Sequence, residues 1–258
     1  MLAPVNPSQN SLAIVLRSRV YGESDKIVTL LSQDFGKMTG IAKGAKNSRR
    51  RFANCLDPFT GVRVHFRSRA NASLAFLEFC DLLEPVGPLS QPLKFAYANY
   101  LTELVDQLTC EGQVVGELFE LLWEGLVELK RGPATGGFLR TFELRLLKHA
   151  GYDPQLGHCQ RCQESIAVDA TAFVDAVEGR VLCAGCQVSR SGTLSFTGAA
   201  VAALEELKDR PLAEGRTRPL RGEIGNRATE LLGHLLAVHL PRPLRSTELI
   251  SSLSRSSV

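Results

Sequence analysis

The sequence predicts a multi-domain α+β protein in which a small closed β-barrel is followed by an α-helical domain, with a cysteine-rich element inserted into the helical domain. Three observations lead to this prediction. Apolar and polar residues alternate in short runs up to residue 82, apolar residues recur at the helical period of about 3.6 from Ser90 onward, and two CxxC pairs interrupt the helical part. The expected domains are residues 1–82 and 83–258, with the insertion at 152–196.

The predicted barrel consists of five short strands. The clearest is residues 61–69, in which an apolar residue at every second position from Val62 to Phe66 alternates with Arg or His. A turn cluster at 33–36 separates two apolar runs and predicts a hairpin. Five short strands favour a closed barrel, because closure leaves no exposed sheet edge. The expected strands are 11–20, 27–32, 37–43, 61–69 and 74–82.

The predicted helices follow the barrel and are separated by residues that end or begin helices. Gly132-Pro133 breaks the pattern after the second helix, and Gly151 ends the third. Thr197 and Ser246 are suited to cap later helices. The expected helices are 93–108, 115–129, 138–150, 197–209 and 223–239, with a short one after Pro243.

Positive charge is concentrated between Gly36 and Arg69, where Asp57 is the single acid. Residues 1–80 carry 12 Lys and Arg against 5 Asp and Glu, whereas residues 81–150 carry 6 against 10. This asymmetry is typical of a module that binds a polyanion and is attached to a separate scaffold. The cations of the stretch are Lys37, Lys43, Lys46, Arg49, Arg50, Arg51, Arg63, Arg67 and Arg69.

Nucleic acid is the favoured polyanion, because a strand face with Arg63 and Arg67 adjoins a loop with three consecutive arginines. The alternatives are a solvated surface that only maintains solubility, an RNA-binding or ribosome-associated module, and a scaffold whose basic loop docks an acidic protein. Aromatic residues near the loop are candidates for base stacking, although such residues are more often in the core. They are Tyr21, Phe35 and Phe52.

No set of catalytic residues accompanies these cations, and we expect the protein not to be an enzyme. Residues 40–46 lack the spacing of a phosphate-binding loop, and Asp34-Phe35-Gly36 occurs without a kinase catalytic loop. Neither CxxC pair follows the H-x-E of a zinc deaminase, and no HExxH is present. No nucleophile, base and oxyanion site occur together.

The two CxxC pairs predict a structural zinc site. They are separated by twenty residues, close to the spacing of four-thiolate zinc sites, and four protein ligands leave no position for a reactive water. The segment between them reads as a hairpin around Glu178-Gly179, so the insertion is zinc-ribbon-like. Two redox dithiols or simply buried cysteines are the alternatives, and Cys55, Cys80 and Cys110 are expected in the core. The expected zinc ligands are Cys159, Cys162, Cys183 and Cys186.

A cytoplasmic location is the expectation from the composition. Hydrophobic residues make up 44% of the chain, and no segment approaches the roughly 18 continuous apolar residues of a membrane helix. The first ten residues lack the basic and apolar regions of a secretory signal.

Several segments with distinctive sequences follow one another along the chain. They are YGESDKIVTLL at 21–31, FGK at 35–37, AKGA at 42–45, LDPF at 56–59 and HLPRPLRS at 239–246. In this order, together with the basic loop, the helical region and the cysteine pairs, they resemble the RecO family of bacterial DNA repair proteins. The resemblance extends over the whole chain.

The resemblance implies that the barrel is an OB fold and that the chain binds single- and double-stranded DNA without acting as an enzyme. It implies that the protein anneals complementary strands, even when single-stranded DNA-binding protein coats them, and acts with RecR to help load RecA. The helical domain is then expected to bind the C-terminal tail of the single-stranded DNA-binding protein. A DNA-associated protein of this kind is expected in the nucleoid. Some members of the family lack the cysteines, so zinc is not a general requirement for the activity.

Overall fold

The computed structural model describes residues 7–68, 74–84, 91–175, 180–187, 193–218 and 220–255. The chain forms two compact units, of which unit 1 is Met1–Lys130 with Ser246–Val258 and unit 2 is Arg131–Arg245. The predicted boundaries at residue 82 and at 152–196 lie within these units, and the division into domains at those positions stays a prediction. No helix in the described ranges is both long and apolar enough to cross a membrane.

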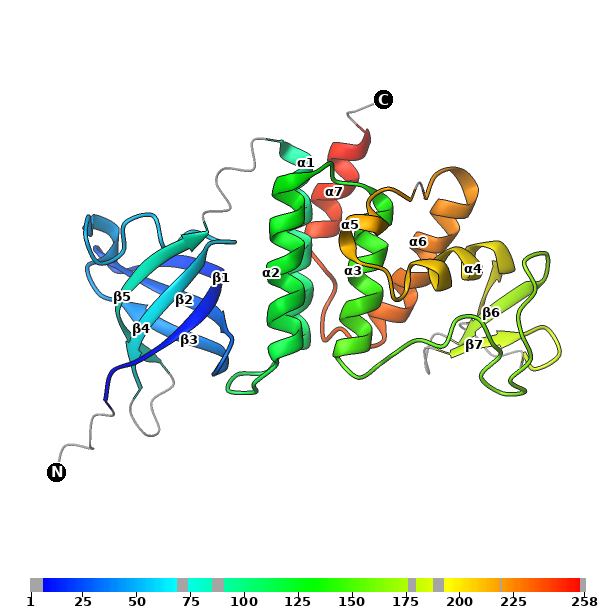
Figure 1. The fold of residues 1–258 in the computed structure, drawn as a ribbon, viewed down its shortest axis with the longest axis horizontal. Coiled ribbons are helices and arrows are strands. Elements are labelled where there is room, and N and C mark those ends of the chain that lie inside the picture. Colours follow the sequence, from blue (N-terminus) through cyan, green and yellow to red (C-terminus); the bar gives the residue numbers. More distant parts are fainter. Residues whose placement is uncertain are drawn as a thin grey trace. The chain divides into compact units, whose positions relative to one another are not determined.

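Unit 1 begins with a closed barrel of five strands in the order β1-β2-β3-β5-β4 (Figure 1). All neighbouring strands are antiparallel except β3 and β5, which run parallel. The prediction of an OB-like barrel is therefore confirmed, and each expected strand is present with slightly different ends. The strands are β1 (Gln9–Tyr21), β2 (Asp25–Ser32), β3 (Gly36–Ala42), β4 (Gly61–Arg67) and β5 (Ala75–Glu84).

The connection from β3 to β4 closes one part of the barrel core. It starts with a short 3-10 helix, η1 (Ala45–Asn47), and then sends Phe52, Cys55 and Leu56 into the same buried cluster as the inward residues of the strands. Burial of these apolar side chains stabilises the loop, because a loop of polar residues alone would gain little on folding.

Three helices complete unit 1: α1 (Pro92–Leu108), α2 (Gly116–Arg131) and α7 (Ser246–Arg255). The predicted cap at Ser246 is explained by α1, since the Glu103 carboxylate accepts hydrogen bonds from both the backbone N–H and the hydroxyl of Ser246, at 2.9 and 2.6 Å. Helix α7 is thus fixed to α1.

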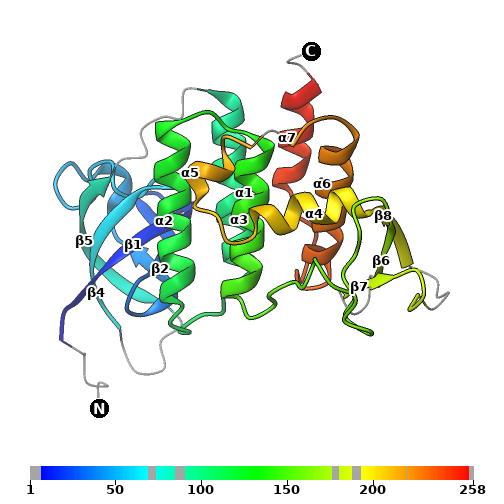
Figure 2. The same ribbon diagram turned by 45° about the vertical axis from the view of Figure 1, so that its right-hand side comes forward.

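Unit 2 combines a small sheet with helices. In the sheet β6 (Thr171–Asp175) lies between β7 (Arg180–Cys183) and β8 (Thr193–Thr197), as Figure 2 shows. The antiparallel pairing of β6 with β7 confirms the predicted hairpin, and its Glu178-Gly179 tip lies outside the described residues. Neither β8 nor the single-turn helix α5 is predicted by the sequence patterns. The helices are α3 (Gly136–His149), α4 (Gly198–Leu207), α5 (Leu212–Gly215) and α6 (Gly222–Ala237).

The three isolated cysteines differ in exposure. Cys55 and Cys80 are buried in the barrel core, as predicted. The expectation of a core position was wrong for Cys110, which is exposed. It lies two residues beyond the end of α1, where the helical stripe of apolar residues no longer faces the core.

Candidate nucleic-acid interface and metal site

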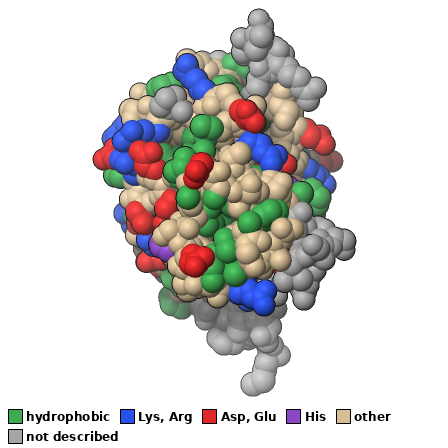
Figure 3. Space-filling model, turned by 90° about the vertical axis from the view of Figure 1, so that its right-hand side faces the viewer, with side chains coloured by type: hydrophobic (Ala, Val, Ile, Leu, Met, Phe, Trp, Pro, Cys, Tyr) green, Lys and Arg blue, Asp and Glu red, His purple; other side chains and the backbone are tan. Residues whose placement is uncertain are grey.

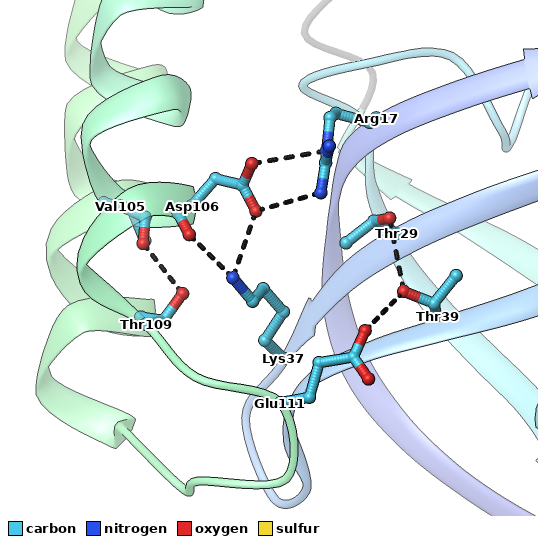
Figure 4. Close-up of polar contacts among 8 residues, drawn as sticks. All are labelled: Arg17, Thr29, Lys37, Thr39, Val105, Asp106, Thr109 and Glu111. Carbon is cyan, nitrogen blue, oxygen red and sulfur yellow. Dashed lines mark hydrogen bonds and ion pairs between the residues drawn. The ribbon is translucent and has the colours of Figure 1, made fainter. Parts of the chain in front are cut away.

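Lys37, the first cation of the basic stretch, holds β3 against α1 (Figure 4). Its ammonium group donates to the backbone carbonyl oxygen of Asp106 at 2.7 Å and to its carboxylate at 3.3 Å. Arg17 of β1 binds the same carboxylate at 3.3 Å. The Lys37 side chain is only 13% exposed and that of Asp106 only 6%. This cation therefore neutralises a buried acid within unit 1.

The connection between α1 and α2 adds to this junction. The Gly112 N–H donates to the Lys37 carbonyl oxygen at 2.9 Å. The Thr39 hydroxyl donates to the Glu111 carboxylate at 2.8 Å (Figure 4). At Gly36, with φ of 66°, an added Cβ would lie 1.9 Å from the carbonyl oxygen of Gln113, so only glycine fits. The outer face of β3 near Lys37 is thus occupied by the helical part of unit 1.

The basic loop, residues 43–51, has the opposite character. All five of its Lys and Arg residues are exposed. Within the described part of the chain, no carboxylate forms an ion pair with Lys46, Arg49 or Arg50. Asp57, the single acid of the stretch, instead pairs with Lys26 at 3.6 Å. The loop therefore presents uncompensated positive charge to solvent.

Hydrogen bonds from the loop backbone hold this loop in one conformation. The Asp25 carboxylate accepts from the Gly44 N–H at 2.8 Å, and the Ser48 hydroxyl accepts from the N–H groups of Arg51 and Phe52 at 3.1 and 3.3 Å. The Gly44 N–H is the main cause that lowers the pKa of Asp25 below its ordinary value of 3.8, and the nearby Lys43 ammonium contributes. The cations are therefore presented on a preformed loop.

Arg51 contributes to the shape of the loop. Its guanidinium group donates to the Lys43 carbonyl oxygen at 2.7 Å and lies over the Phe52 ring, 5.2 Å from the ring centre. Its own carbonyl oxygen accepts from the N–H of Cys80 in β5 at 2.9 Å. The loop consequently lies along β5, on the side away from β4.

The cations of β4 point outward as the alternation predicts, whereas Val62, Val64 and Phe66 are buried. Arg63 is exposed and donates only weakly to the Asn10 side chain, at 3.4 Å. Arg67 is also exposed but binds the Glu78 carboxylate of β5 at 2.8 Å. Arg69 lies outside the described residues. The fold thus places the predicted cations of the loop and of β4 on opposite sides of β5. Lys37 lies elsewhere, at the contact between β3 and α1.

The three aromatic residues considered for stacking lie in different environments. Phe52 is buried in the barrel core. Phe35 packs against this core and meets the Phe66 ring edge-on, with 5.2 Å between ring centres. Tyr21, in contrast, is exposed at the end of β1. Phe35 and Phe52 therefore stabilise the barrel core, and their rings are not available for stacking with bases.

Positive charge does not gather on the face of the molecule drawn in Figure 3. Acidic and basic side chains are interspersed there, with hydrophobic side chains between them. Several of the basic residues of unit 2 are paired, for example Arg210 with Glu206 and Glu214 at 3.3 Å each. Such pairing contrasts with the basic loop of the barrel, whose cations face solvent.

The four cysteines of the CxxC pairs converge on one point. Their sulfur atoms all lie within 4.8 Å of one another, and those of Cys162 and Cys183 are 3.7 Å apart. A tetrahedral ion with metal–sulfur bonds of about 2.3 Å requires sulfur atoms about 3.8 Å apart. All four cysteines are free thiols. The geometry therefore fits a four-thiolate metal site, with β7 ending at one of its ligands.

The protein around the four sulfur atoms lowers the pKa of one cysteine and raises that of another, so the metal-free cluster does not favour four thiolates at once. Burial alone would raise the pKa of Cys159, but the N–H groups of Cys162, Cys183 and Arg161 lower it to about 6. The pKa of Cys186 rises to about 12, first because its sulfur interacts with that of Cys162 and then because of burial. A bound cation would offset the repulsion between neighbouring thiolates, since metal-bound thiols are deprotonated. The site is thus suited to a metal ion.

Comparison with known proteins gives consistent matches along the chain. The family model described as "Recombination protein O N terminal" matches residues 8–86, and "Recombination protein O C terminal" matches residues 89–248. The boundary between the two matches falls between β5 and α1, close to the end of the predicted barrel domain.

Individual relatives are similar over nearly their full length. The chain is 39% identical over 241 residues to "DNA repair protein RecO" of Anaeromyxobacter sp. (strain K), covering 93% of this chain and 94% of that protein. The protein of the same name from Myxococcus xanthus (strain DK1622) is 35% identical over 242 residues, covering 93% and 96%. That of Geobacter sulfurreducens is 35% identical over 251 residues, covering 94% and 97%.

Proposed function

Because this chain belongs to the RecO family of DNA repair proteins, we propose that it binds single- and double-stranded DNA and anneals complementary strands. Annealing requires that two negatively charged strands be held close together while their bases find the pairing register. A cationic surface supplies this by neutralising phosphates and releasing counterions. The proposed activity involves no covalent step, and we therefore infer that the protein is a mediator and not an enzyme.

The exposed cations of the basic loop carry this proposal, because Lys46, Arg49 and Arg50 form no ion pair with any described residue. A preformed loop loses little conformational entropy when phosphates bind to it, so its cations are used efficiently. The β4 cations extend the same surface across β5, although Arg67 must share its charge with Glu78. We assign Lys37 to the junction with α1. The proposed DNA contacts are Lys43, Lys46, Arg49, Arg50, Arg51, Arg63 and Arg67, with Arg69 outside the described residues.

We further propose that the protein acts with RecR to help load RecA, and that its helical part binds the C-terminal tail of the single-stranded DNA-binding protein. The support is membership of the family. The same membership supports a cytoplasmic protein that associates with the nucleoid.

We propose zinc as the metal of the cysteine site. Four thiolates in tetrahedral reach of one point suit zinc, and such a site has no open position for catalysis. The buried apolar side chains described in the β6–β8 sheet are Ala172, Val174, Val181 and Phe196. Coupled metal binding can contribute on the order of 10 kcal/mol to the folding of such a small element. The zinc ion would therefore stabilise this part of unit 2.

The test is an annealing and binding assay of an Arg49→Glu/Arg50→Glu variant. Neither side chain forms an ion pair with the described residues, so the fold should be retained. The matched control is Arg221→Glu/Arg242→Glu, which makes the same change of net charge at two exposed arginines of unit 2. We expect the loop variant to lose DNA binding and annealing and the control to keep both. Unchanged annealing by the loop variant would contradict the assignment, and a strong preference of the wild type for structured RNA would favour an RNA-binding function.

A further inference from the structure

The outer face of β5 carries two exposed aromatic rings, Phe76 and Phe79, which are 40% and 38% exposed. The inward residues of the strand, such as Leu77 and Cys80, fill the barrel core. An irregularity in the pairing of β4 with β5 places the rings three residues apart and still on one face, with Phe76 opposite Arg67 and Phe79 opposite His65. Exposed rings of this size on one strand indicate a binding surface.

The ring of Phe79 is held in a fixed orientation by a second ring. His65 of β4 stacks on it with 3.9 Å between ring centres and 15° between the planes. The Asp81 carboxylate in turn lies 3.4 Å from Nε2 of His65. Because its neighbours hold it, Phe79 offers an ordered apolar surface and loses little entropy when a flat ligand stacks on it.

Cations flank these rings on both sides. On the β4 side lie Arg63 and Arg67, and on the other side lies the basic loop, joined to β5 by the hydrogen bond from Cys80 to Arg51. Among the described residues, the acids on this face are Glu78, which holds Arg67, and Asp81, which lies opposite Arg63 in the strand pairing and contacts His65. Positive charge near the rings therefore comes mainly from the loop, and Arg63 is the second source.

We propose that Phe76 and Phe79, supported by His65, form a platform on which unpaired bases of single-stranded DNA stack, a proposal that rests on the DNA binding inferred above. Every base has a flat π-face, so such a platform tolerates any sequence, and the flanking cations follow the backbone. The bases of a duplex are stacked on one another and cannot reach it. The platform thus adds a preference for single strands to a loop that binds the phosphates of either form.

Stacking is compatible with annealing for a geometric reason. A base held by its face keeps its Watson–Crick edge free, so a complementary strand can pair with it while it is still bound. Aliphatic side chains lack the π-face with which an aromatic ring stacks on a base. An apolar protein partner would have to cover Arg63 and the loop cations. The arrangement of rings between cations therefore favours nucleic acid over a protein.

The experiment compares wild type with Phe76→Leu, Phe79→Leu and the double variant in binding to an unstructured oligothymidine and to a duplex of the same length, over a range of salt. Each ring should contribute about 5- to 150-fold to single-strand affinity. Duplex affinity should stay within about twofold and the salt slope should not change, because every cation that binds phosphate is retained. Phe79→Trp keeps a ring at this position and should bind single strands about as well as the wild type, unlike Phe79→Leu. The fluorescence of its new indole should be quenched on addition of oligothymidine.

Leu83→Ala is the matched control, because Leu83 lies on the same strand and is 41% exposed but has no ring. The platform would be overturned if Leu83→Ala and Phe79→Leu lost single-strand affinity equally, or if the ring variants lost single-strand and duplex affinity equally. Unchanged single-strand affinity of the double variant would overturn it as well. Loss of binding to a protein partner with unchanged DNA affinity would also overturn it. Failure of the wild type to bind either DNA would instead contradict the proposed function itself.

Discussion

The ammonium group of Lys37 bridges the backbone carbonyl oxygen and the side-chain carboxylate of Asp106, at 2.7 and 3.3 Å. This relationship fixes β3 of the barrel to the last turn of α1. It also separates Lys37, which stabilises the fold, from the other described cations of the basic stretch, which face solvent.

Lys37→Met is expected to destabilise unit 1. The substitution removes the two hydrogen bonds to Asp106, whose mostly buried carboxylate then keeps Arg17 as its one side-chain partner among the described residues. Hydrogen bonds to charged groups contribute about 1.5 to 3 kcal/mol, so we expect a loss of roughly this size in the free energy of unfolding. Urea denaturation, followed by a signal from the barrel, measures it.

Lys43→Met is the control for this loss. It removes the same charge from an exposed position, and changes at such sites usually alter stability by less than about 0.5 kcal/mol. If the two variants were equally stable, the proposed role of Lys37 at the junction would be wrong.

Neutralising the loop should change the salt dependence of DNA binding. Each cation that no longer neutralises a phosphate of a single strand makes the slope of log K against log salt shallower by about 0.7. Arg49→Gln/Arg50→Gln should therefore shift the slope by about 1.4, as measured by fluorescence anisotropy at several salt concentrations. An unchanged slope would show that these two side chains do not bind phosphates.

The isolated cysteines should differ sharply in reactivity toward alkylating agents. Burial is the main cause that raises the pKa of Cys80, to about 12, and it also raises that of Cys55, whereas Cys110 is exposed. The thiolate is the reactive form, so among these three Cys110 should be labelled first in the folded protein. Mass spectrometry after a brief iodoacetamide pulse tests this. Early labelling of Cys80 would contradict the packing of the barrel core.

Removing the metal should affect unit 2 and spare the barrel. We expect purified protein to contain about one zinc ion per chain and Cys162→Ser to lose it. Cys162 is an exposed member of the cluster, so the substitution itself should disturb little packing. Hydrogen exchange should then increase around β6 and β7 while the strands of the barrel remain protected. Much less than one metal ion in the wild type would refute the zinc assignment.

The anchor of the basic loop should fail at low pH. The pKa of Asp25 is lowered in the folded protein, chiefly by the Gly44 N–H, so its stabilising effect is present above its ordinary value of 3.8 and is lost as the pH falls through the lower folded value. The amide proton shift of Gly44, followed by NMR, should titrate with a midpoint below 3.8. In Asp25→Asn this transition should be absent. A midpoint above 3.8 would contradict the hydrogen bond.

Local patterns in the sequence were sufficient for most of the helices and strands and for the candidate metal site. The period-two alternation of β4 and the helical stripes depend only on neighbouring residues, and so do the turn at 33–36 and the cap at Thr197, whose hydroxyl accepts from the N–H of Ala200 at 3.3 Å. The CxxC spacing likewise brings four candidate ligands together, because each tight turn directs two sulfurs to one point. Missed elements such as α5 and β8 are too short to show a period.

Only the tertiary structure decided what individual side chains on the barrel do. Net charge along the chain does not distinguish Lys37 from Arg49, because the acid that binds Lys37 lies 69 residues away in sequence. Phe76 and Phe79 are indistinguishable from core residues until the irregular pairing with β4 shows which way they face. Sequence sets the local conformation and the total charge of this protein, whereas exposure and ion pairing depend on contacts between distant segments, which form only when the barrel closes and the helices pack against it.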